Sequence, residues 1–162
     1  MNVGLIGIGT VGGGTYKVLT HNFKEIFNKT GIEIKITHVA DKNISLAERT
    51  VNKSVVIMND AFELIADSKV DTVVELIGGI GVAKDLVKKA LSNGKHVVTA
   101  NKALIAMHGD ELFQIAEKNN VVLAYEAAVA GGIPIIKVLR EGLAGNKIEL
   151  IAGIVNGTTN YI

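Results

Sequence analysis

The sequence predicts a doubly wound α/β fold, in which helices cover both faces of a parallel sheet. Two patterns support this prediction. Short apolar runs typical of buried strands alternate along the chain with amphipathic helical stretches, and that order produces a parallel sheet. The first run, residues 3–6, also leads directly into Gly7-Ile8-Gly9-Thr10-Val11-Gly12 and then into a helical stretch. A strand, a G-x-G-x-x-G turn and a helix in this order are the context of a dinucleotide-binding site.

The three glycines of this turn have separate expected roles. Gly7 would permit the tight bend, Gly9 would let the backbone approach a pyrophosphate, and Gly12 would let the helix pack close to the strand. The helix N-terminus would offer unpaired N–H groups and the positive end of its dipole to the phosphates. Together these features indicate a Rossmann dinucleotide-binding fold. A purely structural glycine turn is the alternative that the motif leaves open.

The next elements follow from periodicity and end signals. A helix is expected over 15–28, because its apolar residues recur at helical spacing and Thr30-Gly31 follows it. The strand expected over 33–40 alternates polar and apolar residues before it closes on two apolar ones. A short helix over 45–52 and a strand over 55–58 come next.

The alternation continues through the middle of the chain. Asp60 and Glu63 have capping-box spacing and open a helix that reaches about residue 67. The run over 70–77 is the clearest buried strand, although it contains Glu75. The later elements are expected as a helix over 82–92, a strand over 96–99, a helix over 110–118 and a strand over 121–125.

The texture of the sequence changes after Tyr125. Residues 126–132 form a loop of small residues, and Pro134 stands where a helix reaching about Leu143 would begin. A strand is expected over 147–155, followed by a polar, turn-forming segment. With no later element to pair with, we expect that strand to expose an apolar edge, which favours association or disorder from about Ile148 onward.

Composition excludes several classes of function. The 48% of hydrophobic residues are enough for one ordinary core, and the net charge of +1 gives no field that attracts nucleic acid or a membrane surface. No stretch reaches the ~20 apolar residues of a membrane span. The absence of cysteine removes disulfides and thiolate sites and fits a cytoplasmic protein. The four histidines show no metal-ligand spacing.

Asp41 is the first candidate binding residue outside the glycine turn. It follows the second predicted strand, where an acidic residue accepts hydrogen bonds from the adenosine ribose hydroxyls. It lies 29 residues after Gly12 rather than the usual ~20, because the first helix and its loop are long. Lys42 would instead suit a 2′-phosphate. Asp41 favours NAD slightly over NADP, and a surface Asp–Lys pair is the alternative.

Lys102 is the candidate residue for binding near the reacting part of a cofactor or for proton transfer. Thr99-Ala100-Asn101-Lys102 follows the fifth predicted strand, at the sheet edge where such folds bind ligands. Lys102 would bind a cofactor phosphate or the nicotinamide ribose, or serve in proton transfer, and a plain surface lysine is the alternative. Glu75 needs partners if it is buried, so it either faces the cleft or accepts hydrogen bonds from backbone amides. The carboxylate of Glu126, with the carbonyls of its small-residue loop, would suit a hard cation.

Several of these stretches together resemble homoserine dehydrogenase, the enzyme that reduces aspartate β-semialdehyde to homoserine. The match spans the whole chain, and the last three of the matching stretches are family-specific. The stretches are residues 3–12, 74–79, 96–104, 126–134 and 153–162.

The resemblance implies a role for each matching residue. It implies a nicotinamide cofactor, NAD or NADP, held by Gly7, Gly9, Thr10, Val11, Gly12 and Lys102. The other residues expected to bind the cofactor are Asp41, Gly78, Thr99 and Gly157. Lys102 matches the family's lysine beside the nicotinamide, which holds NADP or takes part in proton transfer. A structural sodium ion is implied at Glu126, Val129, Gly131 and Ile133. Asn156, Gly157 and Thr158 match the hinge into a substrate domain.

The resemblance also divides the chain. Residues 1–128 are expected to form the dinucleotide-binding domain, and residues 129–162 the start of a truncated substrate and dimerisation domain. The family's acidic substrate-binding residue and catalytic Asp–Lys pair lie beyond this stretch, so we expect cofactor binding with negligible turnover. The implied partners are a small-molecule substrate and, for the complete protein, further copies of itself. A nucleotide-sensing module on the same fold and a different dehydrogenase of small amino or oxo acids are the alternatives.

Overall fold

A computed structural model describes residues 1–153 of the 162-residue chain. Its centre is a six-stranded sheet in the order β3-β2-β1-β4-β5-β6, and every neighbouring pair of strands is parallel. The strands are β1 (Asn2–Ile6), β2 (Lys35–Ala40), β3 (Val56–Met58), β4 (Thr72–Glu75), β5 (His96–Thr99) and β6 (Leu123–Ala124). The strand order reverses between β1 and β4, which is the topological switch point of a doubly wound fold. The predicted fold class is confirmed.

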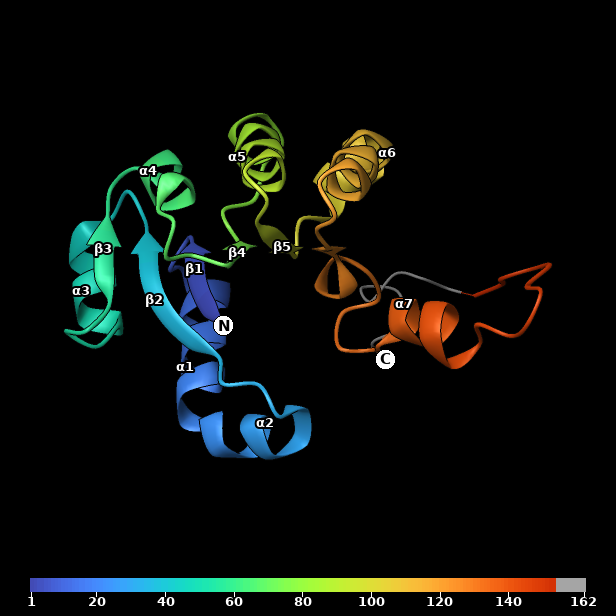
Figure 1. Ribbon diagram of the computed structural model, residues 1–162, viewed down its shortest axis with the longest axis horizontal. Helices are drawn as coiled ribbons and strands as arrows, with labels where there is room; N and C mark the ends of the chain where they lie inside the picture. The colour runs from blue at the N-terminus through green and yellow to red at the C-terminus, as the bar shows by residue number, and fades with distance from the viewer. Residues whose placement is uncertain (154–162) are drawn as a thin grey trace.

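Helices cover both faces of this sheet. Figure 1 shows α4, α5 and α6 together above the strands and α1 below them. The helical elements are α1 (Thr10–His21), α2 (Phe23–Thr30), α3 (Ile44–Thr50), α4 (Ala61–Ala66), α5 (Gly81–Ser92), α6 (Lys102–Lys118), the 3-10 turn η1 (Glu126–Ala128), α7 (Ile135–Lys137) and the π-helical turn η2 (Val138–Gly142). Over residues 1–153, none of these helices combines the length and apolarity needed to cross a bilayer.

The alternation of side chains along the strands builds one core on each face. In β1, Leu5 packs on the side of α1 and α3, whereas Ile6 packs on the side of α4, α5 and α6. This is the two-residue period of a strand buried on both faces. The larger core uses leucines from α4, α5 and α6. Leu86, Leu104 and Leu112 are among them and are almost completely buried.

The helix predicted over 15–28 is wrong in its bounds. The helix starts at Thr10, directly after the glycine turn, and ends at His21. Asn22 leaves helical geometry, and a second helix, α2, continues to Thr30, where Gly31 closes it with a φ of 69°. Consecutive glycines in the first turns of α1 hid its start from the periodicity, because they carry no apolar side chain.

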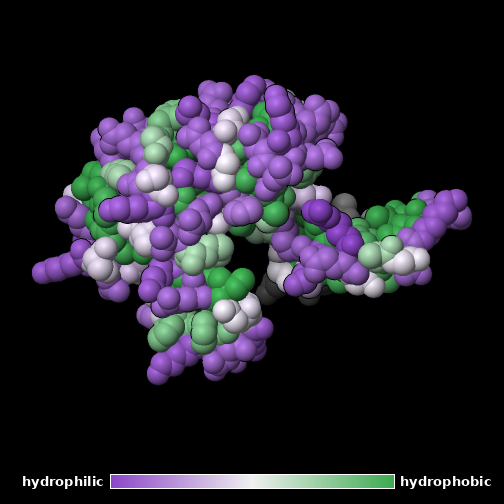
Figure 2. Space-filling view, in the orientation of Figure 1, coloured by the Kyte–Doolittle hydropathy of each residue, from purple (hydrophilic) through white to green (hydrophobic). Residues whose placement is uncertain are grey.

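Two larger differences lie in the second half of the chain, where the predicted helix over 134–143 is also divided into α7 and η2. The helix predicted over 110–118 begins eight residues earlier, at Lys102, because Asn101 caps it. The strand predicted over 147–155 is absent over 147–153, and its last two residues lie outside the described part. No strand of residues 1–153 pairs with this segment, and its apolar side chains stay exposed, Leu150 at 82%. Figure 2 shows hydrophobic residues on this segment, at the right of the view.

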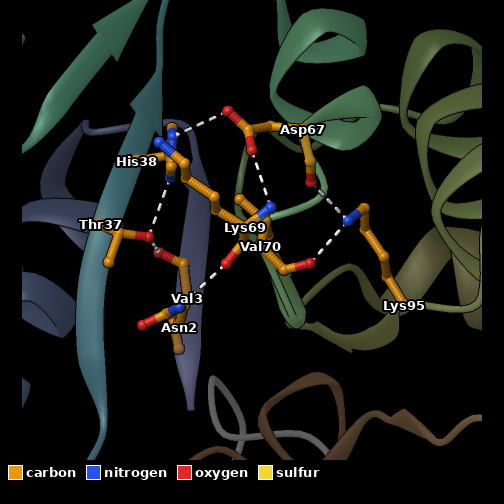
Figure 3. A network of polar contacts seen from close by, with 8 residues as sticks. All are labelled: Asn2, Val3, Thr37, His38, Asp67, Lys69, Val70 and Lys95. Atoms are coloured by element: carbon orange, nitrogen blue, oxygen red, sulfur yellow. Dashed lines mark hydrogen bonds and ion pairs between the residues drawn. The ribbon is translucent and has the colours of Figure 1, made fainter.

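A network of polar contacts fastens the turn before β4 to the amino-terminal edge of the sheet (Figure 3). The buried ammonium group of Lys95 donates hydrogen bonds to the carbonyl oxygens of Asp67, at 2.7 Å, and Val70, at 2.6 Å. The Asp67 carboxylate contacts the His38 ring at 3.3 Å. A hydrogen bond from the Lys69 amide, followed by the charge of His38, lowers the pKa of Asp67. This network lies at the opposite end of the strands from the glycine turn, and it joins the turn before β4 to β1, β2 and the residue before β5.

A charge cluster joins α5 to α6. The Glu111 carboxylate accepts from Lys84 and Lys88, each at 2.8 Å. Hydrogen bonds from Lys84 and then Lys88 lower the pKa of Glu111 from 4.5 to about 2. Because the folded-state pKa is the lower one, this cluster stabilises the fold above pH 4.5 and stops doing so as the pH falls toward 2.

We therefore expect Glu111→Gln to lower the melting temperature slightly at pH 7, by an amount that shrinks as the pH falls from 4.5 toward 2. Thermal unfolding followed by circular dichroism over this pH range measures the difference. Glu117→Gln, at an exposed position of the same helix, is the matched control. A difference between wild type and Glu111→Gln that does not vary with pH would rule out the contribution of the ionised cluster.

Candidate dinucleotide-binding site

The loops at the carboxyl ends of the strands form one edge of the sheet. The register pairs Ile6 with Ala40 on one side and with Glu75 on the other, so these strands end at the same level. Glu75 in turn pairs with Thr99. The glycine turn after β1 and the turn after β4 therefore flank the switch point, where doubly wound sheets bind their ligands.

The glycine turn has the geometry that its sequence predicts. Gly7 has a φ of 94°, and a Cβ atom on it would lie 3.0 Å from the Leu76 carbonyl group and the Ile77 side chain. A Cβ atom on Gly12 would lie 1.9 Å from the carbonyl oxygen of Gly7. The helix thus approaches the turn so closely that no other residue type fits there. Around Gly9, by contrast, a Cβ atom would meet nothing within 4 Å.

The N-terminus of α1 has the features of an anion site. Gly9 caps this helix without a side-chain hydrogen bond, and no acidic residue stands in the first turn. The first amides of a helix have no partner within it and carry the positive end of the dipole. Thr10 and Val11 are exposed at this end, Val11 at 59%. The open space at Gly9 and these amides lie on the same turn.

Asp41 has a contact that the sequence does not reveal. Its Oδ2 atom accepts a hydrogen bond from the amide of Ile8 at 2.7 Å, and its Oδ1 atom accepts one from the amide of Asn43 at 2.7 Å. The carboxylate therefore holds the glycine turn against the end of β2. Each carboxylate oxygen still has a lone pair for another donor, so a role toward a ribose stays a prediction. Lys42 is exposed beside it.

Glu75 is completely buried and accepts hydrogen bonds from backbone amides, which is one of the two roles expected for it. Its Oε1 atom accepts from the amides of Ile77, at 3.0 Å, and Gly78, at 3.3 Å. Its Oε2 atom accepts from the hydroxyl of Thr99 at 2.6 Å. The turn that it holds needs left-handed backbone at both Gly78 and Gly79, with φ values of 69° and 71°.

Asn101 contributes to the site although it is not among the predicted site residues. Its Oδ1 atom accepts from the amide of Leu104 at 3.1 Å and caps α6, while its Nδ2 atom donates to the Gly79 carbonyl at 2.5 Å. An asparagine before an apolar helical run is an N-cap signal, so the sequence could have predicted the contact with Leu104. Lys102 is the first residue of α6 and is exposed. The Thr99 side chain is buried, and its hydroxyl donates to Glu75 and accepts from the Asn101 amide.

The residues predicted to bind a cation lie in η1 and in the loop that connects it to α7. The two oxygens of Glu126 accept hydrogen bonds from the amides of Ile136 and Lys137, both at 2.9 Å, so this side chain binds the start of α7. The other three residues, Val129, Gly131 and Ile133, lie in the connecting loop. Within residues 1–153 there is no cluster of three or more His, Cys, Asp or Glu side chains that could hold a metal ion. A cation here would therefore depend on backbone carbonyls. Gly157 lies outside the described residues.

Comparisons with known proteins agree with this geometry. A family model described as the NAD-binding domain of homoserine dehydrogenase matches residues 7–126, and a homoserine dehydrogenase model matches residues 134–162. The chain is 56% identical over its whole length to a homoserine dehydrogenase of Neisseria gonorrhoeae and 49% identical to one of Pseudomonas aeruginosa. It spans 37% of the length of each of these relatives.

Two solved structures extend the comparison to the fold. A homoserine dehydrogenase from Thiobacillus denitrificans matches 99% of this chain and 37% of its own with a TM-score of 0.91 and 50% identity. A hyperthermophilic archaeal homoserine dehydrogenase in complex with NADPH matches 89% of this chain and 49% of its own, with a TM-score of 0.72 and 28% identity. Since the NAD-binding model alone covers well over half of the sequence, this chain belongs to the homoserine dehydrogenase family.

Proposed function

We propose that this chain binds NAD or NADP across the carboxyl edge of its sheet and serves the reversible reduction of aspartate β-semialdehyde to homoserine. The observation that carries the proposal is the contact of Gly12 with Gly7. A Cβ atom at Gly12 would lie 1.9 Å from the Gly7 oxygen, at the switch point of the sheet. The glycine turn is thus packed as a dinucleotide fingerprint requires, with open space left at Gly9.

The turn over residues 7–12 would hold the pyrophosphate. Gly9 leaves room for it, and the free amides of Thr10 and Val11 would donate to its oxygens. Asp41 would accept hydrogen bonds from the ribose hydroxyls of the adenosine half while it continues to hold the Ile8 amide. Lys42 is placed to attract a 2′-phosphate instead.

The nicotinamide half would lie over the loops that follow β4 and β5. When bound, the cofactor supplies or accepts the hydride. Gly78 would face it from the β4 turn, and Thr99 would contact it only through its backbone. Gly157 lies outside the described residues and stays a predicted contact of this half. Lys102 stands at the first position of α6, where the helix dipole disfavours a cation. That position suits a lysine that binds a cofactor phosphate or the nicotinamide ribose, or that exchanges a proton with the substrate oxygen.

A sodium ion is proposed for the loop after β6. Its ligands would be a carboxylate oxygen of Glu126 and the backbone carbonyls of Val129, Gly131 and Ile133, which are hard oxygen donors. The amide contacts from α7 leave lone pairs on both Glu126 oxygens. The ion and the start of α7 would therefore share this side chain.

Binding of NAD and NADP to wild type, Asp41→Asn and Asp41→Ala, measured by calorimetry, tests the proposal. Asn can still accept the Ile8 hydrogen bond, although its NH2 group then faces the Asn43 amide, which loses its acceptor. The ribose is left with one neutral acceptor, so we expect Asp41→Asn to weaken NAD by roughly 1.5–3 kcal/mol. NADP should lose much less. Asp41→Ala also releases Ile8, and it should weaken both cofactors.

Two outcomes would count against this assignment. Wild-type protein that binds neither cofactor at millimolar concentration contradicts the proposed function itself. Equal losses of NAD and NADP affinity in Asp41→Asn would leave the function standing but remove the ribose role of Asp41. Lys53→Ala, at an exposed position after α3, serves as a control for nonspecific effects of lost charge.

A further inference from the structure

The carboxyl edge holds a closed ring of hydrogen bonds centred on one buried carboxylate. Glu75 is 0% exposed at the end of β4, after Val73 and Val74. Burying such a group among valines is unfavourable unless its oxygens find donors. Here they find three, namely two amides of the β4 turn and the hydroxyl of Thr99.

The ring is completed through the next loop. The Thr99 oxygen accepts a hydrogen bond from the Asn101 amide at 3.0 Å, and the Asn101 side chain donates to the carbonyl of Gly79. Gly79 belongs to the same turn that Glu75 holds. The turn after β4 and the start of α6 are therefore tied to each other twice, once through Glu75 and Thr99 and once directly.

These two loops lie on one side of the switch point. The glycine turn and Asp41 follow β1 and β2, whereas the ring follows β4 and β5. A dinucleotide crosses the switch point with one mononucleotide on each half of the sheet. If Asp41 marks the adenosine half, the ring lies under the nicotinamide half, and its last member is the residue before Lys102.

We propose that Glu75 is a positioning residue for the nicotinamide half, which it serves by locking the β4 turn and the first residue of α6 into one rigid unit. This inference rests on the proposed function of the same edge. Glu75 does not touch the cofactor, because it is completely buried. Its effect passes through Thr99 and Asn101 to Lys102, and through Gly78 to the surface of the turn.

The test compares two ligands on each variant. ADP-ribose contains the adenosine half and both phosphates but no nicotinamide. If NADP binds better than NAD, the matched ligand is ADP-ribose 2′-phosphate. In Glu75→Gln, the amide would have to donate to Thr99, whose hydroxyl then has no acceptor. We expect Glu75→Gln to weaken the complete dinucleotide roughly tenfold or more, with ADP-ribose affinity unchanged. Glu117→Gln, exposed on α6, should change neither affinity.

Thr99 supplies a second pair of variants that does not depend on how Glu75→Gln folds. Thr99→Val removes the hydroxyl at nearly constant shape, and it should weaken the complete dinucleotide but not ADP-ribose. Thr99→Ser keeps the hydroxyl and should bind the dinucleotide as wild type does. Equal losses for both ligands, or no loss in either Glu75→Gln or Thr99→Val, would overturn the positioning role. Wild-type protein that binds neither ligand would instead contradict the proposed function, so the two failures are distinguishable.

Discussion

Gly12→Ala is expected to destabilise the fold by about 3 kcal/mol or more and to abolish dinucleotide binding. The new Cβ atom would lie 1.9 Å from the carbonyl oxygen of Gly7 and 3.2 Å from the side chain of Leu5. The first of these contacts is to backbone, so no side-chain rotation relieves it. Either α1 moves away from β1 or the turn opens, and both movements displace the amides that would hold the pyrophosphate.

Gly14→Ala is the matched control for this experiment. It lies in the same helix, it is exposed, and a Cβ atom there would meet nothing within 4 Å. Alanine is the better helix former, so this variant should be more stable than wild type by about 0.4–1 kcal/mol. Urea unfolding and cofactor calorimetry on both variants measure the contrast. Equal stability of the two variants would mean that the helix and the turn are not in close contact.

The fold class follows from sequence because several independent signals agree. The apolar runs over 3–6, 70–77 and 96–99 contain the cores of β1, β4 and β5. β1 and β4 are buried on both faces, as continuous apolar strands require, whereas β5 has Val98 half-buried and His96 exposed on one of its faces. The order of strand, glycine turn and helix at the start of the chain indicated a Rossmann fold without any knowledge of strand order. Pairing in the order 3-2-1-4-5-6 is then the arrangement known for this motif.

The partners of the site's polar residues were not predictable in the same way. Glu75 was ambiguous because a carboxylate in an apolar strand can face a cleft or accept amides, and only the paths of the β4 turn and of Thr99 decide between them. The contact of Asp41 with Ile8 joins residues 33 positions apart. Such contacts depend on loop geometry, which has no periodicity to read. The Asn101 cap is different, because its local signal was present.

The strand prediction over 147–153 is wrong for another reason. Its apolar residues have a strand pattern, yet a strand exists only where its amides and carbonyls find a neighbour. The described residues provide no such neighbour, and Leu150 and Ile151 are 82% and 62% exposed. The sequence pattern therefore predicted an exposed apolar segment without a later partner, but the strand predicted there is wrong because no strand of residues 1–153 pairs with it.

The second large effect expected is for Gly9→Ala, which should remove most cofactor affinity while the fold stays almost unchanged. Gly9 has a φ of −62° and a ψ of −156°, which alanine adopts without strain, and its Cβ atom would meet no protein atom within 4 Å. As an N-cap, alanine is typically worse than glycine by about 0.5–1 kcal/mol. The added methyl group instead fills the space that a pyrophosphate needs, and loss of two amide–phosphate hydrogen bonds would weaken binding roughly 100-fold or more.

This variant also separates the two meanings of the glycine motif. If the turn were only structural, Gly9 would be its replaceable member, and Gly9→Ala would leave both stability and NAD or NADP affinity as in wild type. If it holds a pyrophosphate, affinity for NAD, NADP and ADP-ribose should fall together, because all three contain that group. Urea unfolding and calorimetry on the same samples give both quantities. A stable Gly9→Ala protein with wild-type affinity would refute pyrophosphate binding at the turn even though Gly12 remains essential to the fold.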